Sequence, residues 1–195
     1  MSAASQGEPR IPPLAPEEYG PEAMAVIGEL LHAQGSGSVQ QAVPEFVATM
    51  LRHRDLFQRQ ADLSTQLFSG ALSFRDVELV LLRTAWLCHA AFVWGQHVQT
   101  AKANCGYTSN DIERITQGSS APGWDERSRA ILRAVEELHE TATISDAAWA
   151  PLAENLDYPQ LIELPVLVGH MQGVAYLQNA MRVRLMDGNP GLSAR

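Results

Sequence analysis

Apolar residues recur along most of this chain at the three- and four-residue spacing of amphipathic helices. No turn such as Asn-Gly joins alternating apolar and polar stretches, so β-hairpins are not indicated. The fold class is therefore predicted to be all-α. The expected helices begin near Pro21, Pro44, Asp55, Ser73, Phe92, Ser109, Asp125, Ser145 and Leu161.

The most apolar part of the pattern predicts a central helix followed by a close neighbour. The stretch Val77–Leu87 is apolar nearly all round, which is typical of a buried helix. Ser73 is the expected N-cap, and Asp76 is placed to reach back to it in a short capping box. The neighbouring helix is expected from about Phe92 to Cys105 and to end at Gly106, because glycine readily closes a helix in the left-handed conformation.

Prolines mark the N-terminal end of the predicted domain. Residues 1–20 carry four of them, which forbid a continuous helix and favour an extended arm, a tail or a strap on a partner subunit. Residues 21–188 are expected to form one helical domain, and residues 189–195 a C-terminal tail. Pro165 lies inside the last expected helix, residues 161–185, and is expected to kink it.

Composition excludes several classes of protein. The chain has 195 residues, 46% of them hydrophobic, enough for a packed core. A net charge of −8 without a basic stripe argues against nucleic-acid binding. No apolar run approaches the roughly 20 residues that cross a bilayer, and the first residues lack a signal peptide. A cytoplasmic protein without membrane contact is expected. The two cysteines, Cys88 and Cys105, are expected to be buried reduced thiols.

An acid and a base lie in the apolar region, which makes them candidates for chemistry. Glu78 and His97 are 19 residues apart, and burying even a neutral polar group without a partner costs about 2 to 7 kcal/mol. On one unbroken helix the two side chains would stand about 28 Å apart along the axis. A turn near residues 88–92 would instead fold two helices into a hairpin and bring them together.

The pattern Glu78, Gly95-Gln96-His97 and residues 101–107 resembles the carboxymuconolactone decarboxylase and AhpD-like alkylhydroperoxidase superfamily. Segments like residues 51–56, 73–75 and 168–179 occur in the same order in its larger members, so the resemblance covers roughly residues 43–185. It implies an AhpD-like helical fold with a central antiparallel helix hairpin, the glutamate on the first helix and the histidine on the second. It also implies a homo-oligomer, a trimer or a hexamer.

The resemblance favours one branch of the superfamily. In the AhpD-like peroxidases, two cysteines lie seven and four residues before the histidine, and the matching positions here are Ala90 and Val93. Without that pair, disulfide-cycled peroxidase chemistry is disfavoured. The decarboxylases lack the pair and keep the histidine. They act on a lactone carboxylate without metal or organic cofactor, which implies decarboxylation or a related proton transfer on a small carbonyl or lactone acid.

Roles within the candidate site follow from side-chain chemistry. His97 is the expected general acid or base, because imidazole titrates near neutral pH. Glu78 would orient it or carry a second proton. Both also have a structural interpretation: His97 as a core histidine and Glu78 as a carboxylate that ties helices together. Trp86, Trp94 and His170 are the candidate substrate-binding residues, each with an alternative place in the core.

Other polar residues carry weaker signals. Arg83 is expected to pair with another acid and not to face the same ligand as Glu78. His89 follows Cys88 directly, but adjacent helical residues point about 100° apart, so thiol activation by His89 is not expected. No His-x-x-x-His or Glu-x-x-His pair supports a metal site, and no cofactor is expected.

Two further hypotheses about function stay open. The first is an AhpD-like antioxidant protein that uses a single cysteine, Cys88 or Cys105. The second is a non-catalytic oligomeric binding protein that retains the fold. Titration of free thiols with and without peroxide distinguishes the first from the decarboxylase hypothesis. Product analysis with small carboxylates distinguishes the second.

Overall fold

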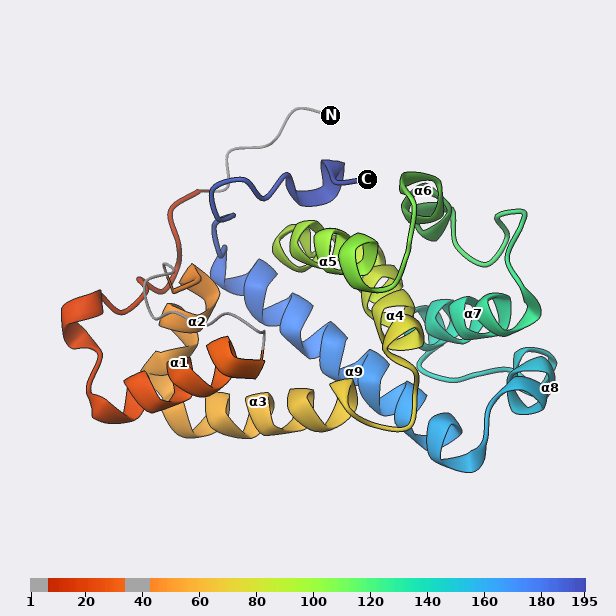
Figure 1. The fold of residues 1–195 in the computed structure, drawn as a ribbon, viewed down its shortest axis with the longest axis horizontal. Coiled ribbons are helices and arrows are strands. Elements are labelled where there is room, and N and C mark those ends of the chain that lie inside the picture. Colours follow the sequence, from red (N-terminus) through yellow and green to blue (C-terminus); the bar gives the residue numbers. More distant parts are fainter. Residues whose placement is uncertain (1–6, 34–42) are drawn as a thin grey trace.

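The computed structural model describes residues 7–33 and 43–195, and it shows helices without strands in these ranges (Figure 1). The predicted all-α fold class is confirmed. The α-helices are α1 Pro21–Ala33, α2 Glu45–Met50, α3 Arg54–Phe68, α4 Phe74–Leu87, α5 Ala91–Asn104, α6 Ser109–Gln117, α7 Glu126–Thr141, α8 Asp146–Asn155 and α9 Tyr158–Met181. Short 3-10 turns lie at η1 Pro16–Glu18, η2 Leu51–His53 and η3 Gly191–Ser193.

Helix starts agree with the capping residues of the sequence. Ser73 accepts a hydrogen bond from the backbone N–H of Asp76, and Asp125 and Ser145 cap α7 and α8 in the same way. The 3-10 turn over residues 51–53 separates α2 from α3, where the sequence predicted an interruption. The predicted loop at residues 35–38 lies outside the described residues.

The predicted bounds of the last helix are wrong at both ends. α9 begins at Tyr158, before the expected residue 161, because the Asp157 side chain caps it by accepting from the N–H of Gln160 at 2.9 Å. It ends at Met181, before residue 185, because Arg182 takes the left-handed conformation with φ 55°. The helix continues through Pro165.

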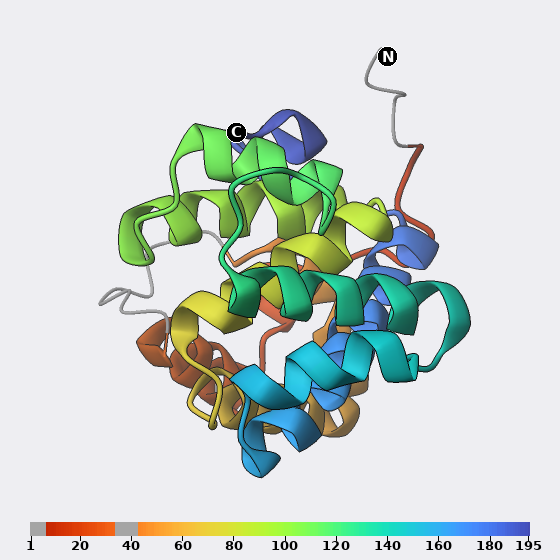
Figure 2. The same cartoon turned by 90° about the vertical axis from the view of Figure 1, so that its right-hand side faces the viewer.

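α4 is the centre of the fold. Its residues 77 and 79–82 are fully buried, and the helix packs against α5, α7 and α9. Figure 1 shows α1, α2 and α3 at one end of the molecule, α6, α7 and α8 at the other, and α9 running between them. In the perpendicular view of Figure 2, α7 and α8 lie in front of this centre. No helix of the described residues is both long and apolar enough to cross a membrane.

α4 and α5 form an antiparallel hairpin, as the superfamily resemblance implied. Three contacts join them in opposite chain directions: Trp86 with Trp94, Glu78 with His97, and Arg75 with the carbonyl of Cys105. The connection is only residues 88–90, and it turns sharply because His89 has φ 52°. The hairpin therefore brings the second turn of α4 beside the second turn of α5.

Both terminal segments pack against helices of their own chain. In the N-terminal arm, the N–H of Leu14 donates to the carbonyl of Ala48 at 3.1 Å, and Arg52 Nε donates to the carbonyl of Pro12 at 2.5 Å. The described part of the arm therefore straps its own α2 region. The C-terminal segment covers α5, where Asn189 Nδ2 donates to the carbonyl of Phe92 at 3.0 Å.

The C-terminal segment explains why residue 95 is a glycine. A Cβ atom at Gly95 would overlap the side-chain amide of Asn189 and the backbone of Gly191. The glycine of the Gly95-Gln96-His97 motif therefore allows the C-terminal segment to approach α5 closely. It does not face Glu78.

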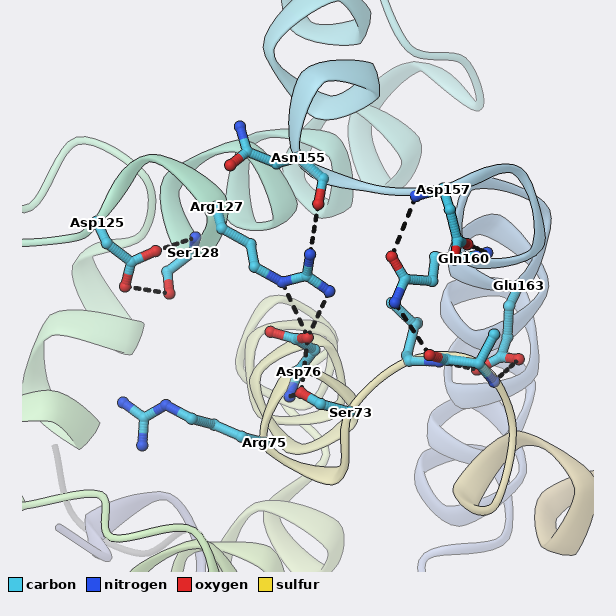
Figure 3. A network of polar contacts seen from close by, with 12 residues as sticks. Ser73, Arg75, Asp76, Asp125, Arg127, Ser128, Asn155, Asp157, Gln160 and Glu163 are labelled. Carbon is cyan, nitrogen blue, oxygen red and sulfur yellow. Dashed lines mark hydrogen bonds and ion pairs between the residues drawn. The ribbon is translucent and has the colours of Figure 1, made fainter.

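A polar network fixes the first turn of α4 (Figure 3). Asp76 Oδ2 accepts hydrogen bonds from Arg127 at 2.9 and 3.1 Å, and Arg127 also donates to the carbonyl of Asn155. Beside it, the Glu163 carboxylate accepts from the backbone N–H groups of residues 71–72 at 2.7 and 3.0 Å. These contacts tie α4 to α7 and α8 two residues before Glu78, and they tie the loop before α4 to α9. Charge-assisted bonds of this kind are the stronger ones.

Candidate acid-base site

Glu78 and His97 lie in direct contact. The side chain of Glu78 is fully buried on α4, and His97 Nδ1 on α5 lies 3.1 Å from each of its carboxylate oxygens. The predicted approach of these two residues is confirmed. The imidazole keeps 22% of its side-chain surface exposed. Glu78 is therefore excluded from solvent, whereas the His97 ring reaches it.

The contact determines which imidazole nitrogen is available for chemistry. An ionised carboxylate can only accept hydrogen bonds, so Nδ1 donates to Glu78 and carries a proton. Nε2 of His97 has no hydrogen-bond partner among the described residues. It is therefore the atom that can take a proton from a ligand or give one to it.

Aromatic rings form an apolar wall beside His97. The Phe68 ring, on the last turn of α3, has its centroid 6.1 Å from that of His97. The centroid of the Phe74 ring lies 6.4 Å from that of Phe68, and the Phe74 side chain is partly exposed. Because apolar surroundings lower the local dielectric, they strengthen the electrostatic interaction between the carboxylate and the ring.

A thiol lies near this pair but is not activated by it. Burial raises the pKa of Cys105, the negative charge of Glu78 raises it further, and the nearby Arg75 guanidinium opposes them. Arg75 is occupied elsewhere, since it donates to the carbonyl of Cys105 at 2.6 Å and covers the Tyr107 ring at 4.0 Å. The thiolate form, which is the nucleophile, is therefore disfavoured at Cys105.

His170 belongs to a second polar contact on the neighbouring helices. Its Nε2 lies 2.7 Å from Ser64 Oγ, which joins α9 to α3. Ser64 precedes Phe68 by four residues, so the two lie on one face of α3. The structure therefore places His170 one helical turn from the residue that covers His97. It does not place His170 in hydrogen-bond contact with Glu78 or His97.

His170 is expected to make stability depend on pH. Burial lowers its pKa in the folded chain, so the unfolded chain binds the proton more readily. This stability is fully present above the ordinary histidine pKa of about 6.5 and is lost as the pH falls below it. We expect His170→Gln to flatten the decline in melting temperature between about pH 7 and about pH 5, followed by circular dichroism. His53→Gln, at an exposed histidine, is the control, and an unchanged slope for His170→Gln would contradict the assignment.

Trp86 and Trp94 pack beneath the C-terminal segment. Trp94 is fully buried and donates its indole N–H to the carbonyl of Ala194 at 3.2 Å. The Trp86 ring lies 4.9 Å from it, and the Arg195 guanidinium lies 5.1 Å from the Trp86 ring. These contacts agree with the alternative place of both indoles in the core. None of them joins the tryptophans to Glu78 or His97.

Sequence reasoning missed Phe68, which lies beside His97, and two contacts of the surrounding helices, those of Ser64 with His170 and of Arg75 with Cys105. Ser64 and Phe68 recur at helical spacing, but nothing in the sequence indicates which helix they face. For metal binding, no group of three or more His, Cys, Asp or Glu side chains in residues 7–33 and 43–195 is placed to hold an ion.

A surface hollow lies elsewhere, between α7 and α8. It has a volume of about 490 Å³ and is lined mainly by charged and small residues. Arg133 and Glu137 in its lining pair with each other at 2.9 Å. Neither Glu78 nor His97 lines it. The charged pair in this hollow is exposed on the Arg133 side, unlike the buried pair of Glu78 and His97.

Known proteins share this sequence pattern and fold. The sequence profile of the carboxymuconolactone decarboxylase family matches residues 54–137, which contain Glu78 and His97. No curated protein matches the sequence. Among solved structures, an AhpD-core, peroxidase-related protein from Ralstonia eutropha JMP134 is 14% identical with a TM-score of 0.77, over 92% of this chain and 93% of its own.

Two other solved structures show the same likeness. The debrominase Bmp8, as a cysteine-to-alanine variant in complex with 2,3,4-tribromopyrrole, is 14% identical with a TM-score of 0.75, over 91% of this chain and 92% of its own. A protein from Agrobacterium tumefaciens, provisionally assigned to AhpD-type antioxidant defence, is 19% identical with a TM-score of 0.66, over 70% and 94%. At these identities the neighbours show the AhpD-like fold. With the family match, they confirm the superfamily resemblance.

Proposed function

We propose that this protein, which resembles the carboxymuconolactone decarboxylase and AhpD-like superfamily, is a cofactor-independent lyase that acts on a small carbonyl or lactone acid. The observation that carries the proposal is the fully buried carboxylate of Glu78, held at 3.1 Å by His97, whose other nitrogen is without a described partner. Such a pair is an acid and base oriented for proton transfer. The reaction type comes from the superfamily resemblance.

The two residues would have separate roles in a decarboxylation. When the C–C bond to the carboxylate breaks, carbon dioxide leaves. The electron pair of that bond stays on the neighbouring carbon, and the adjacent carbonyl stabilises the resulting negative charge. His97 Nε2 would deliver a proton to that carbon. Glu78 would hold the ring through Nδ1, and its negative charge would compensate the charge on the protonated ring. The Phe68 side of the site would keep water from the reacting carbon.

A single-cysteine antioxidant protein is the alternative. Against it, burial raises the pKa of both Cys88 and Cys105, so neither is a ready thiolate. Residues Ala90 and Val93 occupy the two positions of the peroxidase cysteine pair. The third hypothesis, a non-catalytic oligomeric binding protein, shares the same site residues but predicts no product. The ligand in the Bmp8 complex, a small halogenated pyrrole, supports a small-molecule ligand in either case.

Product analysis tests the proposal. The full chain is incubated in D₂O with a set of small β-keto and lactone acids and, separately, with cumene hydroperoxide plus a thiol reductant. We expect release of carbon dioxide from one class of acid, with deuterium on the carbon that lost it. Consumption of the hydroperoxide with no turnover of any acid would favour the antioxidant protein. Binding of an acid without turnover would favour the binding protein.

We also propose that the chain forms a homo-oligomer, a trimer or a hexamer, and that α9 contributes its surface. Apolar side chains recur along the exposed side of α9 at helical spacing: Tyr158, Ile162, Val166 and Tyr176. The helix carries one carboxylate, Glu163, which is occupied by the backbone of residues 71–72, and one imidazole, His170, which is half-buried against Ser64. An uncharged, exposed apolar face of this length is typical of a contact between proteins.

Light scattering checks the oligomer. At micromolar concentration we expect three or six times the mass of one chain, and Ile162→Arg should lower that mass because it places a charge in the contact. Trp149→Arg is the matched control, since Trp149 is also exposed but lies on α8. A monomer for the unsubstituted chain would contradict the proposal.

A further inference from the structure

A cysteine, a histidine and a glutamine from three helices meet away from the acid-base site. Cys88 at the end of α4 has its Sγ 3.7 Å from His139 Nδ1 on α7. The same Nδ1 lies 3.1 Å from Gln172 Nε2 on α9. All three residues are half-buried, so each keeps part of its surface exposed to solvent. Ten residues of α4, about 15 Å along its axis, separate Cys88 from Glu78.

The hydrogen bonds show where the imidazole proton lies. The NH₂ group of a glutamine amide only donates hydrogen bonds, so Nδ1 of His139 accepts from Gln172 and has no proton of its own. The neutral ring then carries its proton on Nε2. Nδ1 is thus an acceptor that faces the thiol of Cys88, as a general base faces a nucleophile. Gln172 fixes the ring by donating to the same Nδ1, so this hydrogen bond gives way when Nδ1 takes a proton from the thiol.

The surroundings of Cys88 favour a neutral reaction partner and a base-assisted step. Burial raises the pKa of Cys88, so the group rests as a thiol and must lose its proton in order to react. Its hydrogen-bonding neighbours are an imidazole and amides, since Asn179 Nδ2 donates to the Cys88 carbonyl at 2.8 Å. The other thiol, Cys105, lies at the far end of α5, about 21 Å along that helix. Any reaction here must therefore be complete with one thiol and one base.

We propose that Cys88, His139 and Gln172 form a second site, in which the Cys88 thiol adds to a small uncharged α,β-unsaturated carbonyl compound. The Sγ–C bond forms at the β-carbon, and the electron pair of the C=C bond moves towards the carbonyl group. His139 Nδ1 takes the thiol proton and delivers it to the α-carbon. Nothing leaves, and no oxidant or second thiol is consumed. Gln172 is a positioning residue that holds the ring.

N-ethylmaleimide, an uncharged acceptor of the same addition, is the probe. The rate of labelling at each cysteine of the full chain is measured by mass spectrometry of its peptides. Cys105 is the internal control, because it is also half-buried with a raised pKa and contacts no imidazole among the described residues. We expect Cys88 to react at least about 10 times faster than Cys105, a smaller factor than the roughly 10² to 10⁴ that general-base assistance typically provides.

Variants of His139 and Gln172 distinguish general-base assistance from steric access to the Cys88 thiol. His139→Ala should lower the Cys88 labelling rate at least about tenfold and leave the Cys105 rate unchanged. The Cys88 rate should recover in part when free imidazole is added. An unchanged Cys105 rate also reports that the fold is intact. Gln172→Glu should slow Cys88 more than Gln172→Ala does, because a carboxylate accepts from Nδ1 and keeps a proton there.

Three results would overturn the second site. One is equal labelling of the two cysteines in the unsubstituted chain. Another is faster labelling of Cys88 in His139→Ala, which would make His139 a cover over the thiol. The third is a slowed His139→Ala variant that imidazole does not rescue.

Discussion

Replacing His97 with asparagine should lower turnover of an acid substrate by about 10² to 10⁴, the usual share of a general acid or base. The asparagine amide keeps a hydrogen bond to the buried Glu78 carboxylate, so the fold should stay intact. What it loses is the nitrogen that transfers a proton. Steady-state kinetics with the acid found by product analysis, beside a melting curve for each protein, measures the two effects separately.

The cysteines provide the matched controls for this experiment. Cys88→Ser and Cys105→Ser should change acid turnover far less than His97→Asn, because neither thiol has a partner with which to form a disulfide. Peroxide reduction would give the opposite order, with one serine substitution silencing the protein and His97→Asn only slowing it. Should a serine substitution eliminate acid turnover while His97→Asn retains it, the acid-base hypothesis is wrong.

Replacing Arg83 with methionine should lower the free energy of unfolding by about 3 to 5 kcal/mol, the cost of breaking a buried ion pair from one side. Arg83 pairs with Glu136 at 2.9 Å and donates to the carbonyls of Ile115 and Thr116 at 2.9 and 2.8 Å. Burial lowers the pKa of Arg83, which agrees with a poorly solvated guanidinium. Methionine fills a similar space but leaves those carbonyls and Glu136 with fewer donors.

Urea unfolding measures this loss, and Arg133→Met is the control. Arg133 also pairs with a glutamate on α7, Glu137, but it is exposed, and exposed pairs contribute little because water and salt screen them. We expect a much smaller change for Arg133→Met. Equal losses for the two variants would show that burial does not strengthen the contribution of Arg83.

The helices and the acid-base pair were predictable because their signals are local or carried by the superfamily pattern. Ser73, Asp125 and Ser145 each cap a helix, and a cap acts on backbone groups two or three residues away. To predict the Glu78–His97 contact, one additional fact was needed, namely that the chain turns between these residues. The resemblance supplied that fact, and the left-handed His89 provides the turn.

Contacts between distant helices were not predictable in this way. His170 with Ser64 spans 106 residues, Trp94 with Ala194 spans 100, and Cys88 with His139 spans 51. Each depends on which faces of two helices meet, and that is decided by packing over the whole core. For the same reason the sequence indicated that Arg83 pairs with an acid but did not identify Glu136 as that acid.

The exposed face of α9 is uneven along its length, and this bears on the symmetry of any oligomer built on it. Its first half carries Ile162 and Val166, whereas Gly169 and Gly173 in its second half leave open space where side chains would be. Two copies of the helix packed antiparallel would set Ile162 over Gly173 and Val166 over Gly169, twice, once from each copy. Such self-complementary contacts have two-fold symmetry, so they require an even number of subunits. A hexamer meets that condition, and a trimer does not.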